Sequence, residues 1–426
     1  MPRLMVFSHS GFSDTNANGI TLKNLLSAFS AEEKAEFYLD VQPPDYSAAH
    51  RYFRVTDTQM VKAFLGKKSR HIFEFDPNAE TSAEKKSGSS PKKIPVWLKK
   101  QKYNFAVKWL REQLWAISPW GHRRLEAFID EFRPDALVYM VGESIFLDKL
   151  VLKTCHRLQV PLVLYNGEAF RIIDLKTRRG LERAYYRRVE KLYERLSRRA
   201  AMVIYNCEML REDYEARYPH CAQAMVAYNS ARCDHGPYQP GAEVSITYFG
   251  NLGVGRSDEL LRVARVLSRI DPALRLDIYG NALPEAAEAF SRQENIRYHG
   301  FVDAAALHDI VEKSDILLHV ESFDETIIPK LKYAFSTKIA QCLCAGRCFV
   351  SFAPQGSASS RYLQEAEGTL LVSDEKELEQ LLRELVADPA LRQSYAQKAA
   401  ATGRANHDMQ ITAARVRREM EGLLHG

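Results

Sequence analysis

The chain has 426 residues, 46% of them hydrophobic and 27% charged, which excludes a disordered protein and exceeds what one core of ordinary size accommodates. We therefore expect two domains. The net charge of +5, from 59 basic and 54 acidic residues, excludes a histone-like polycation.

The start of the chain lacks the features of a signal peptide, because the first ten residues hold one short apolar run and no small-residue cleavage site. No stretch approaches the roughly 18 uninterrupted apolar residues that a spanning helix needs. The seven cysteines are odd in number and lack the paired spacing of zinc knuckles, so we expect reduced thiols. These features predict a cytoplasmic protein whose membrane contact is peripheral.

In the first half, short β-branched or aromatic runs alternate with amphipathic stretches, which is typical of a parallel sheet covered by helices on both faces. The predicted strands are Leu4–Ser8, Phe37–Val41, Ala136–Tyr139, Leu162–Asn166 and Met202–Tyr205. The predicted helices are Ile145–Leu158, Leu181–Ala200 and Glu208–Tyr218. We assign residues 1–240 to a first doubly wound domain.

The second half repeats this alternation more clearly. The predicted strands are Ser245–Phe249, Arg275–Tyr279, Ile296–His299, Ile316–Val320, Cys348–Phe352 and Thr369–Val372. Two prolines and two glycines within residues 234–242 predict a hinge, which gives a second domain over 241–405. Helices are also predicted at Pro389–Gly403 and Asp408–Leu424, and we expect residues 406–426 to pack back across the domain junction.

Positive charge is concentrated in two segments, 85–124 with eleven Lys or Arg and one acid, and 171–199 with eleven Lys or Arg and four acids. The first segment, an insertion in the first domain, holds all four tryptophans. Tryptophan mixed with lysine is typical of a surface at anionic lipid headgroups, or the aromatic rings instead pack inward while the lysines are solvated. A nucleic-acid partner is not expected, because no known module accompanies the basic residues. The membrane interpretation assigns membrane or acceptor contact to Trp97, Lys99, Lys100, Trp109, Trp115 and Trp120.

A glycine turn with an arginine follows the first strand of the second half, in Tyr248-Phe-Gly-Asn-Leu-Gly-Val-Gly-Arg256. Glycines allow the backbone to approach a diphosphate, and an arginine can bind its oxygens with two donors. The spacing differs from G-x-G-x-x-G, so the dinucleotide fingerprint is absent. The candidate donor-binding residues here are Gly250, Asn251, Gly253 and Arg256, although such turns are often only turns.

Two more candidates follow later strands of the second domain. Glu321 comes directly after a predicted strand, where ligands of open α/β sheets bind, so it can hold the hydroxyls of a sugar or be an ordinary solvated carboxylate. Lys338 lies in the first turn of a short predicted helix that has Ser336 or Thr337 as N-cap and Gly346 after its end. The helix dipole disfavours a lysine there, which favours a functional role at a phosphate.

In the first domain, His9 follows the first strand and is a candidate for contact with an acceptor or a sugar. Glu168, in Asn166-Gly-Glu168, is the alternative carboxylate at another strand end. His9 can equally be an ordinary polar loop residue.

In this order the motifs resemble the GT-B-fold glycosyltransferases, in particular the family-4-like enzymes that build bacterial surface polysaccharides. The resemblance covers most of the second domain. It rests on the Phe-Gly-Asn-Leu-Gly turn with Arg256, His299-Gly-Phe-Val302, Ser314-Asp-Ile, Glu321-Ser-Phe and Ser336-Thr-Lys-Ile. In the first domain it rests on Ser8-His-Ser, Asn18-Gly-Ile-Thr21 and Arg133-Pro-Asp135. It implies an α/β fold of two doubly wound, Rossmann-like domains facing across a cleft.

The resemblance also implies roles for the candidates. Arg256 and Lys338 would neutralise the diphosphate leaving group, Gly19 would let the backbone approach it, and Glu321 would bind the transferred sugar. Where the family has a second glutamate, which usually holds the ribose, this chain has Gln341. The catalytic candidates are therefore His9, Glu321 and Glu168, with no metal and no cofactor.

The implied activity is that of a hexosyltransferase-like enzyme at the inner face of the plasma membrane. It would move a sugar from a nucleotide-diphosphate donor to a growing, lipid-linked surface glycan, with retention of configuration. Two alternatives remain. One is a nucleotide-sugar epimerase of the same fold, and the other is an inactive GT-B-like partner subunit, for which Gln341 is the only indication.

Overall fold

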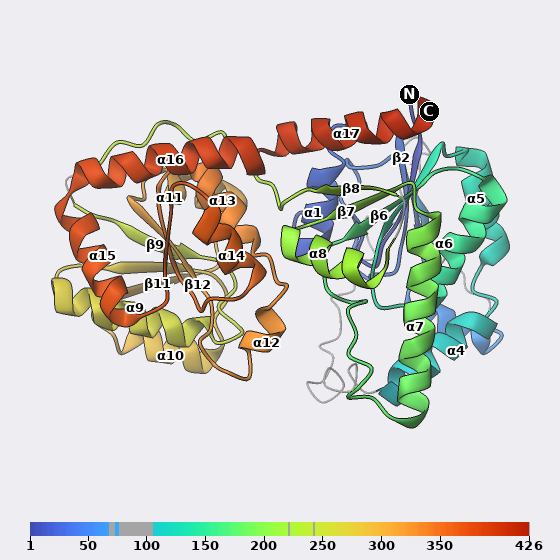
Figure 1. The fold of residues 1–426 in the computed structure, drawn as a ribbon, viewed down its shortest axis with the longest axis horizontal. Coiled ribbons are helices and arrows are strands. Elements are labelled where there is room, and N and C mark those ends of the chain that lie inside the picture. The colour runs from blue at the N-terminus through green and yellow to red at the C-terminus, as the bar shows by residue number, and fades with distance from the viewer. Residues whose placement is uncertain (68–72, 76–104, 220–221, 242, 426) are drawn as a thin grey trace. The chain divides into compact units, whose positions relative to one another are not determined.

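A computed structural model describes residues 1–67, 73–75, 105–219, 222–241 and 243–425 (Figure 1). The chain forms two compact units: the first comprises residues 1–227 and 414–426, and the second comprises 228–413. Trp97, Lys99 and Lys100 lie outside the described residues. Within the described ranges, no helix has both the length and the apolar character needed to cross a bilayer.

The first unit is built on an eight-stranded sheet with the order β4-β3-β2-β1-β5-β6-β7-β8, parallel except for the pairing of β4 with β3. Its strands are β1 (Leu4–Phe7), β2 (Lys34–Tyr38), β3 (Arg51–Arg54), β4 (Phe73–Phe75), β5 (Ala136–Met140), β6 (Leu162–Asn166), β7 (Met202–Tyr205) and β8 (Gln223–Val226). Four of the five predicted strands are confirmed. The second was placed three residues too late, and β3, β4 and β8 were not predicted.

Helices cover both faces of this sheet (Figure 1). They are α1 (Ala17–Leu25), α2 (Asp57–Phe64), α4 (Phe105–Ile117), α5 (His122–Phe132), α6 (Ile145–Leu158), α7 (Gly180–Arg199), α8 (Glu208–Arg217) and the end of α17 (Met409–His425). Successive side chains of a strand point to opposite faces, so Val138 of β5 joins the core beneath α1 and α17. The next residue, Tyr139, instead meets α6, where its hydroxyl donates to Asp148.

The first residues of strand β2 are not recognised by a hydrophobicity pattern, because two of them, Lys34 and Glu36, are charged although they are buried. Glu36 accepts hydrogen bonds of 2.9 Å from the Ser8 hydroxyl and from the Phe12 backbone N–H. The Lys34 ammonium donates to the carbonyls of Leu26 and Phe29 at 3.1 and 2.8 Å. Burial raises the pKa of Glu36 to about 8 and lowers that of Lys34 to about 8. Both groups are tolerated inside because the neighbouring loops satisfy them.

The second unit is built on a six-stranded parallel sheet with the order β11-β10-β9-β12-β13-β14. Its strands are β9 (Ile246–Phe249), β10 (Leu276–Tyr279), β11 (Ile296–Gly300), β12 (Ile316–Val320), β13 (Cys348–Phe352) and β14 (Thr369–Val372), which confirms all six predicted strands. The helices are α9 (Arg256–Ile270), α10 (Pro284–Ser291), α11 (Ala304–Glu312), α12 (Ile328–Leu331), α13 (Thr337–Ala345), α14 (Ala358–Glu365), α15 (Glu375–Ala387) and α16 (Pro389–His407). Helices α9 and α15 lie on one face of the sheet, and α13 and α16 lie on the other (Figure 1).

The second unit begins at Tyr228, earlier than the hinge expected within residues 234–242. Contacts within the unit explain this difference. The Asn229 side chain donates to the carbonyl of Phe335 at 2.9 Å, and the Tyr238 hydroxyl donates to Asp315 at 2.6 Å. The proline- and glycine-rich segment is therefore an anchored part of the second unit.

A disulfide joins Cys233, the residue before this segment, to Cys344 in α13. The expectation that all thiols are reduced is therefore wrong. The two cysteines are 111 residues apart in the sequence, and no spacing pattern links them.

The last residues of the chain return to the first unit, since residues 414–426 belong to it. Val416 and Met420 are 0% and 2% exposed within its core. Arg417 forms two contacts of 3.0 Å with the carboxylate of Glu33 and also donates to the carbonyl of Ala28.

Two of the tryptophans assigned to a membrane surface are core residues, each only 1% exposed, so that assignment is wrong for Trp115 and Trp120. The Trp115 ring stacks on Phe146 with ring centres 4.1 Å apart, and its N–H donates to Asp57 at 2.8 Å. The Trp120 N–H donates to the carbonyl of Trp115. Trp109 is 48% exposed. The inward-packing alternative is therefore correct for two of the three described rings.

Candidate active site

The predicted donor-binding residues of the second unit gather at the carboxyl ends of its central strands. After β9 the chain turns through Val254 and Gly255, which have φ angles of 60° and 76°. The left-handed backbone at these two positions ends the turn and makes Arg256 the first residue of α9. Glu321 directly follows β12, the strand that pairs with β9. The topology therefore brings a predicted phosphate ligand beside a predicted sugar ligand.

Arg256 and Glu321 form an ion pair, with Nη2 of the guanidinium 2.9 and 2.8 Å from the two carboxylate oxygens. Their side chains are 18% and 7% exposed. A charge-assisted contact of this kind holds both groups in fixed positions at the mouth of the sheet. Sequence reasoning predicted both residues but not that they contact each other.

His319 supports Glu321 from within β12. It is 2% exposed, its Nδ1 lies 2.9 Å from the Ser351 hydroxyl, and its Nε2 lies 3.3 Å from Glu321 Oε1. Burial alone would raise the pKa of Glu321, but its contacts with His319 and Arg256 outweigh that effect and lower the pKa. Glu321 is therefore held as a carboxylate.

Lys338 and Gln341 lie together on α13. Ser336 caps the helix by accepting from the Lys338 backbone N–H, and Gly346 ends it with a φ of 61°, which confirms the predicted caps. The Lys338 ammonium donates to Gln341 Oε1 at 2.8 Å. Burial lowers the pKa of Lys338, and the positive charge of Arg256 lowers it further. Gln341 is a neutral amide, so it does not cancel the positive charge of Lys338 as a glutamate at this position would.

Glycines make room for this arrangement. A Cβ atom on Gly250 would lie 2.3 Å from Lys338 Cε, and one on Gly280 would lie 2.0 Å from the Gly250 carbonyl oxygen. Both glycines have positive φ angles, of 133° and 148°. In the same turn the Asn251 side chain accepts from the Gly253 backbone N–H at 2.8 Å. The Lys338 side chain therefore packs directly on the backbone of Gly250, and the hydrogen bond to Asn251 closes the turn.

A cavity of about 280 Å³ opens beside Glu321. Its other walls are α12, Lys332 and the loop of residues 354–357 that follows β13. It lies within the second unit, at the edge of the sheet where ligands of open α/β folds bind.

In the first unit, His9 follows β1 at the carboxyl edge of the sheet. Its ring lies against Gly142, after β5, where an added Cβ would approach His9 Cδ2 to 2.2 Å. Burial, followed by the charges of Arg111 and Arg171, lowers the pKa of His9 to about 3. Among the described residues, the buried Nε2 has no hydrogen-bond partner. His9 is therefore a neutral imidazole with an unused ring nitrogen.

Arg171 is fully buried close to His9, in an ion pair that sequence reasoning missed. Its Nη2 lies 2.9 Å from Asp148 Oδ1, and both side chains are 0% exposed. The Tyr139 hydroxyl donates to the same oxygen at 2.8 Å.

The two remaining candidates of the first unit are Glu168 and Gly19. Glu168 follows β6 and has an exposed side chain, while its carbonyl accepts from the Tyr214 hydroxyl. Gly19 is buried in α1, where an added Cβ would lie 2.5 Å from the Gly11 carbonyl oxygen and 2.6 Å from Ser13 Cβ. This packing already requires a glycine, and a role for Gly19 at a diphosphate stays a prediction.

The comparisons with known proteins agree with this geometry. Residues 256–418 match a family described as glycosyl transferase-like. No curated protein matches the sequence.

Two solved structures match over the full length, and a third matches over part of it. Sucrose-phosphate synthase from Thermosynechococcus elongatus is 12% identical, with 100% of both chains covered and a TM-score of 0.63. Anabaena HepE, solved with UDP, is 10% identical, with 99% of this chain and 100% of that chain covered and a TM-score of 0.64. TarM is 13% identical, covering 70% of this chain and 57% of its own, with a TM-score of 0.52. At these identities the structural matches establish the fold, which is the expected GT-B fold. The chain therefore has the GT-B fold, and residues 256–418, most of them in its second unit, match the glycosyl transferase-like family.

Proposed function

We propose that the protein transfers a hexose from a nucleotide-diphosphate donor to a glycan acceptor. The observation that carries this proposal is the convergence of Arg256, Lys338 and Glu321 at the carboxyl edge of the second sheet. Two cations and a carboxylate beside a cavity match a donor that has two phosphates and a polyhydroxylated sugar. HepE has been solved with UDP and with UDP-glucose, which supports a donor of this class.

The reaction would rest on electrostatic stabilisation of the departing nucleoside diphosphate. Arg256 begins α9 and Lys338 lies in the first turn of α13, so two helix N-termini add backbone N–H groups and positive dipole ends to the two side-chain cations. Such preorganised charge lowers the barrier to loss of an anionic leaving group. We propose that this charge suffices without a metal or a cofactor.

The sugar and the acceptor would be held by the carboxylates and by His9. Glu321 would bind sugar hydroxyls in the adjoining cavity, and Gln341 would offer its amide to the ribose in place of the family's glutamate. In the first unit, the unused Nε2 of His9 would contact the sugar or the acceptor, with Glu168 as the alternative carboxylate. We propose retention of configuration, as in the family that the motifs resemble.

Calorimetric titration with a panel of nucleotide sugars tests the donor. Lys338→Ala is expected to weaken binding of UDP or of the preferred donor by about 10- to 100-fold, the usual loss for one hydrogen bond to a charged group. The matched control is Lys376→Ala, because Lys376 is also the second residue of a helix, α15, but is exposed.

Unchanged affinity in Lys338→Ala would contradict the assigned role. Turnover of the nucleotide sugar without any acceptor would instead identify an epimerase. A lack of donor binding by the wild-type protein would identify an inactive partner subunit.

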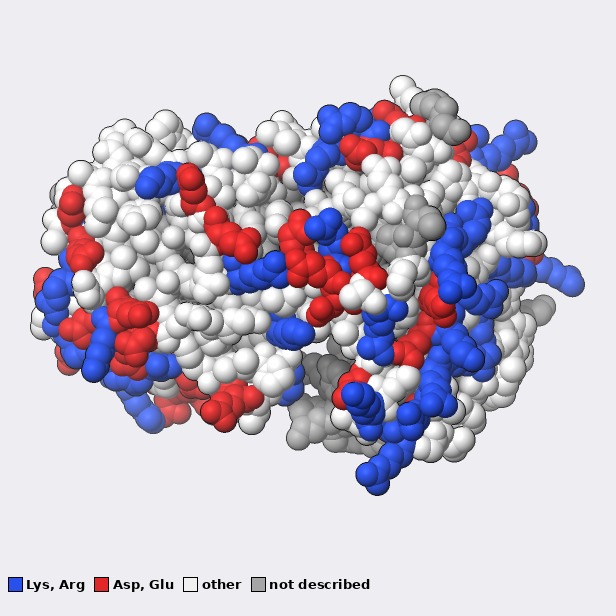
Figure 2. Space-filling model, viewed as in Figure 1, with Lys and Arg blue, Asp and Glu red and all other residues white. Residues whose placement is uncertain are grey.

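We also propose that the first unit contacts an anionic membrane, where a lipid-linked glycan acceptor would be found. Figure 2 shows Lys and Arg side chains gathered over α7. Its exposed basic residues are Arg183, Arg187, Arg188, Lys191, Arg195 and Arg198. Leu181 in α7 and Trp109 and Leu110 in α4 are 81%, 48% and 53% exposed, and the two helices meet where Phe105 contacts Tyr185. Exposed apolar side chains beside basic ones are the composition of a headgroup contact.

Flotation with phosphatidylglycerol vesicles at low salt tests this surface. Arg187→Ser/Arg188→Ser is expected to reduce binding about 10- to 30-fold, because each of the two basic residues contributes about 1 kcal/mol near an anionic surface. The control Arg265→Ser/Arg297→Ser removes the same charge from exposed positions of the second unit. Equal vesicle binding by the two double variants would refute the assigned surface.

A further inference from the structure

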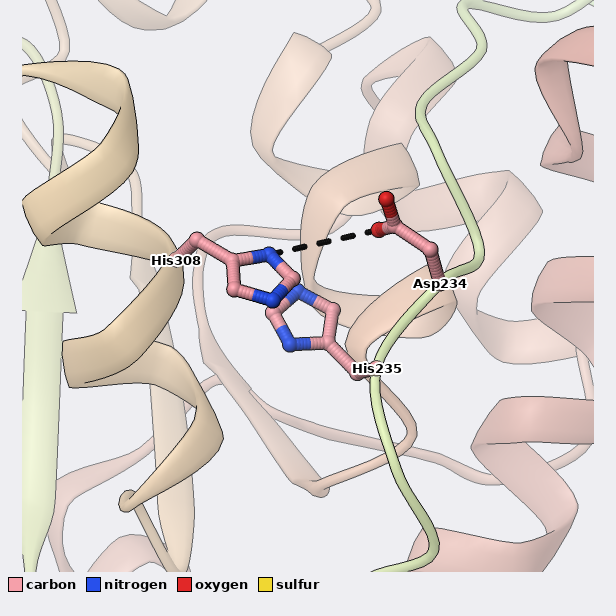
Figure 3. A group of neighbouring side chains, drawn as sticks. All are labelled: Asp234, His235 and His308. Atoms are coloured by element: carbon pink, nitrogen blue, oxygen red, sulfur yellow. Dashed lines mark ion pairs between the residues drawn. The ribbon is translucent and has the colours of Figure 1, made fainter.

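A group of metal-binding side chains lies in the second unit, outside the proposed donor site (Figure 3). Asp234 and His235 come from the segment that opens this unit, and His308 comes from α11. Each offers one ligand atom, and these atoms lie within 4.8 Å of one another. The rings of His235 and His308 lie one over the other with centres 4.1 Å apart, and His308 Nδ1 faces the Asp234 carboxylate at 4.0 Å (Figure 3).

The surroundings of His235 are those of a metal ligand. Its Nδ1 lies 2.8 Å from Glu312 Oε2, so Nε2 is the nitrogen available to an ion. Glu312 is itself fixed, because it accepts from the Gly236 backbone N–H at 3.1 Å and pairs with Arg347 at 3.2 Å. A carboxylate that holds the second nitrogen of a histidine is the usual outer shell of such sites, since it sets the tautomer and the ring orientation.

We propose that Asp234, His235 and His308 bind one Zn²⁺ ion, or a similar divalent transition metal. Two imidazoles and one carboxylate suit zinc better than Mg²⁺ or Ca²⁺, which prefer oxygen ligands. Zinc ligands lie about 2.0–2.1 Å from the ion, which places ligand atoms about 3.3 Å apart. The three groups must therefore draw inward, and rotation of exposed or half-exposed side chains can achieve this. Water would complete the tetrahedron.

The proposed metal site lies away from the proposed donor site. Glu312 ends α11 just before β12 begins, whereas Glu321 follows the end of β12. A strand rises about 3.3 Å per residue, so the five residues of β12 separate its two ends by more than 10 Å. The proposed metal ligands and the proposed donor-binding residues therefore lie at opposite ends of the parallel strands. The ion would join the segment that opens the second unit to α11.

Titration of the full-length, chelator-treated protein with Zn²⁺ tests this proposal, with Co²⁺ as a spectroscopic probe. We expect one Zn²⁺ per chain, a rise of several degrees in Tm, and the visible bands of tetrahedral Co²⁺. His308→Ala and Asp234→Asn should each weaken Zn²⁺ binding at least about tenfold, since even outer-shell changes cost about 10- to 100-fold. Glu312→Gln should weaken it by that outer-shell amount and keep the Co²⁺ bands.

The matched control is His299→Ala. His299 lies in the same unit, pairs with Asp277 at 2.6 Å and stacks on Tyr279, but among the described residues it belongs to no group of metal-binding side chains. We expect this variant to bind Zn²⁺ as the wild type does. The proposal is overturned if the wild type shows no saturable Zn²⁺ or Co²⁺ binding, or if both His308→Ala and Asp234→Asn bind Zn²⁺ unchanged. Binding is measured without a nucleotide sugar, so the result is independent of the proposed activity.

Discussion

Replacing Arg256 by alanine is expected to weaken binding of a nucleotide-diphosphate donor about 100-fold or more and to destabilise the second unit. The loss of affinity follows from removing a guanidinium that can bind two phosphate oxygens at once. The loss of stability follows because Glu321, 7% exposed, is left without the guanidinium that contacts both of its carboxylate oxygens. Removing one side of such a buried pair costs about 3 kcal/mol in the free energy of unfolding, or roughly 6–12 °C in Tm.

A second substitution separates the two effects. In Arg256→Ala/Glu321→Gln no buried charge remains unpaired, so most of the lost stability should return while donor affinity stays low. Arg265→Ala is the control, because it removes an arginine from an exposed position of the same helix. Wild-type donor affinity in Arg256→Ala, measured by calorimetry below its unfolding temperature, would exclude Arg256 from the donor site.

Arg171→Met is expected to cause the largest loss of stability in the first unit, about 3–5 kcal/mol in the free energy of unfolding. Methionine retains most of the side-chain volume but leaves the fully buried Asp148 without its counter-charge. Arg179→Met, at an exposed position eight residues later, should be near neutral. Chemical denaturation of the two variants and the wild type measures the difference.

The pH dependence of this loss identifies its cause. Burial already raises the pKa of Asp148 to about 6, so the folded state binds more protons than the unfolded state between about pH 4 and 6. Stability from this group therefore falls as the pH rises through that window. Without Arg171 the pKa of Asp148 rises further, so the deficit of Arg171→Met should be larger at pH 8 than at pH 5. A deficit independent of pH would indicate lost packing instead.

The second unit was predictable because its local signals agree. Ile316–Val320 is apolar except for His319, and the helix before Gly346 has a serine cap and a glycine end, so strand and helix follow from the sequence. Arg256, Glu321 and Lys338 were predicted because parallel strands place their carboxyl ends at one edge. The sequence also contains a signal for His319, which was not predicted. It precedes Glu321 by two residues and therefore lies on the same side of the strand.

The first unit was less predictable because several of its charged and aromatic residues are buried where the sequence pattern predicts exposure. Arg171 and Asp148, 23 residues apart, are fully buried, although charged residues are rarely so. Trp115 and Trp120 were predicted to be interface residues because they lie in a segment rich in Lys and Arg, yet their N–H groups find partners in the core. Such contacts depend on distant residues meeting in space, and no local pattern encodes them.

The return of residues 414–426 to the first unit means that this unit is not one continuous stretch of polypeptide. A fragment that stopped at Ala227 would lack Val416 and Met420, and the apolar core surface that they cover would be exposed to water. During synthesis, the core of the amino-terminal part can close only after residues 414–426 have been translated. Attempts to produce it alone should therefore supply the final helix, either fused behind residue 227 or added as a separate peptide.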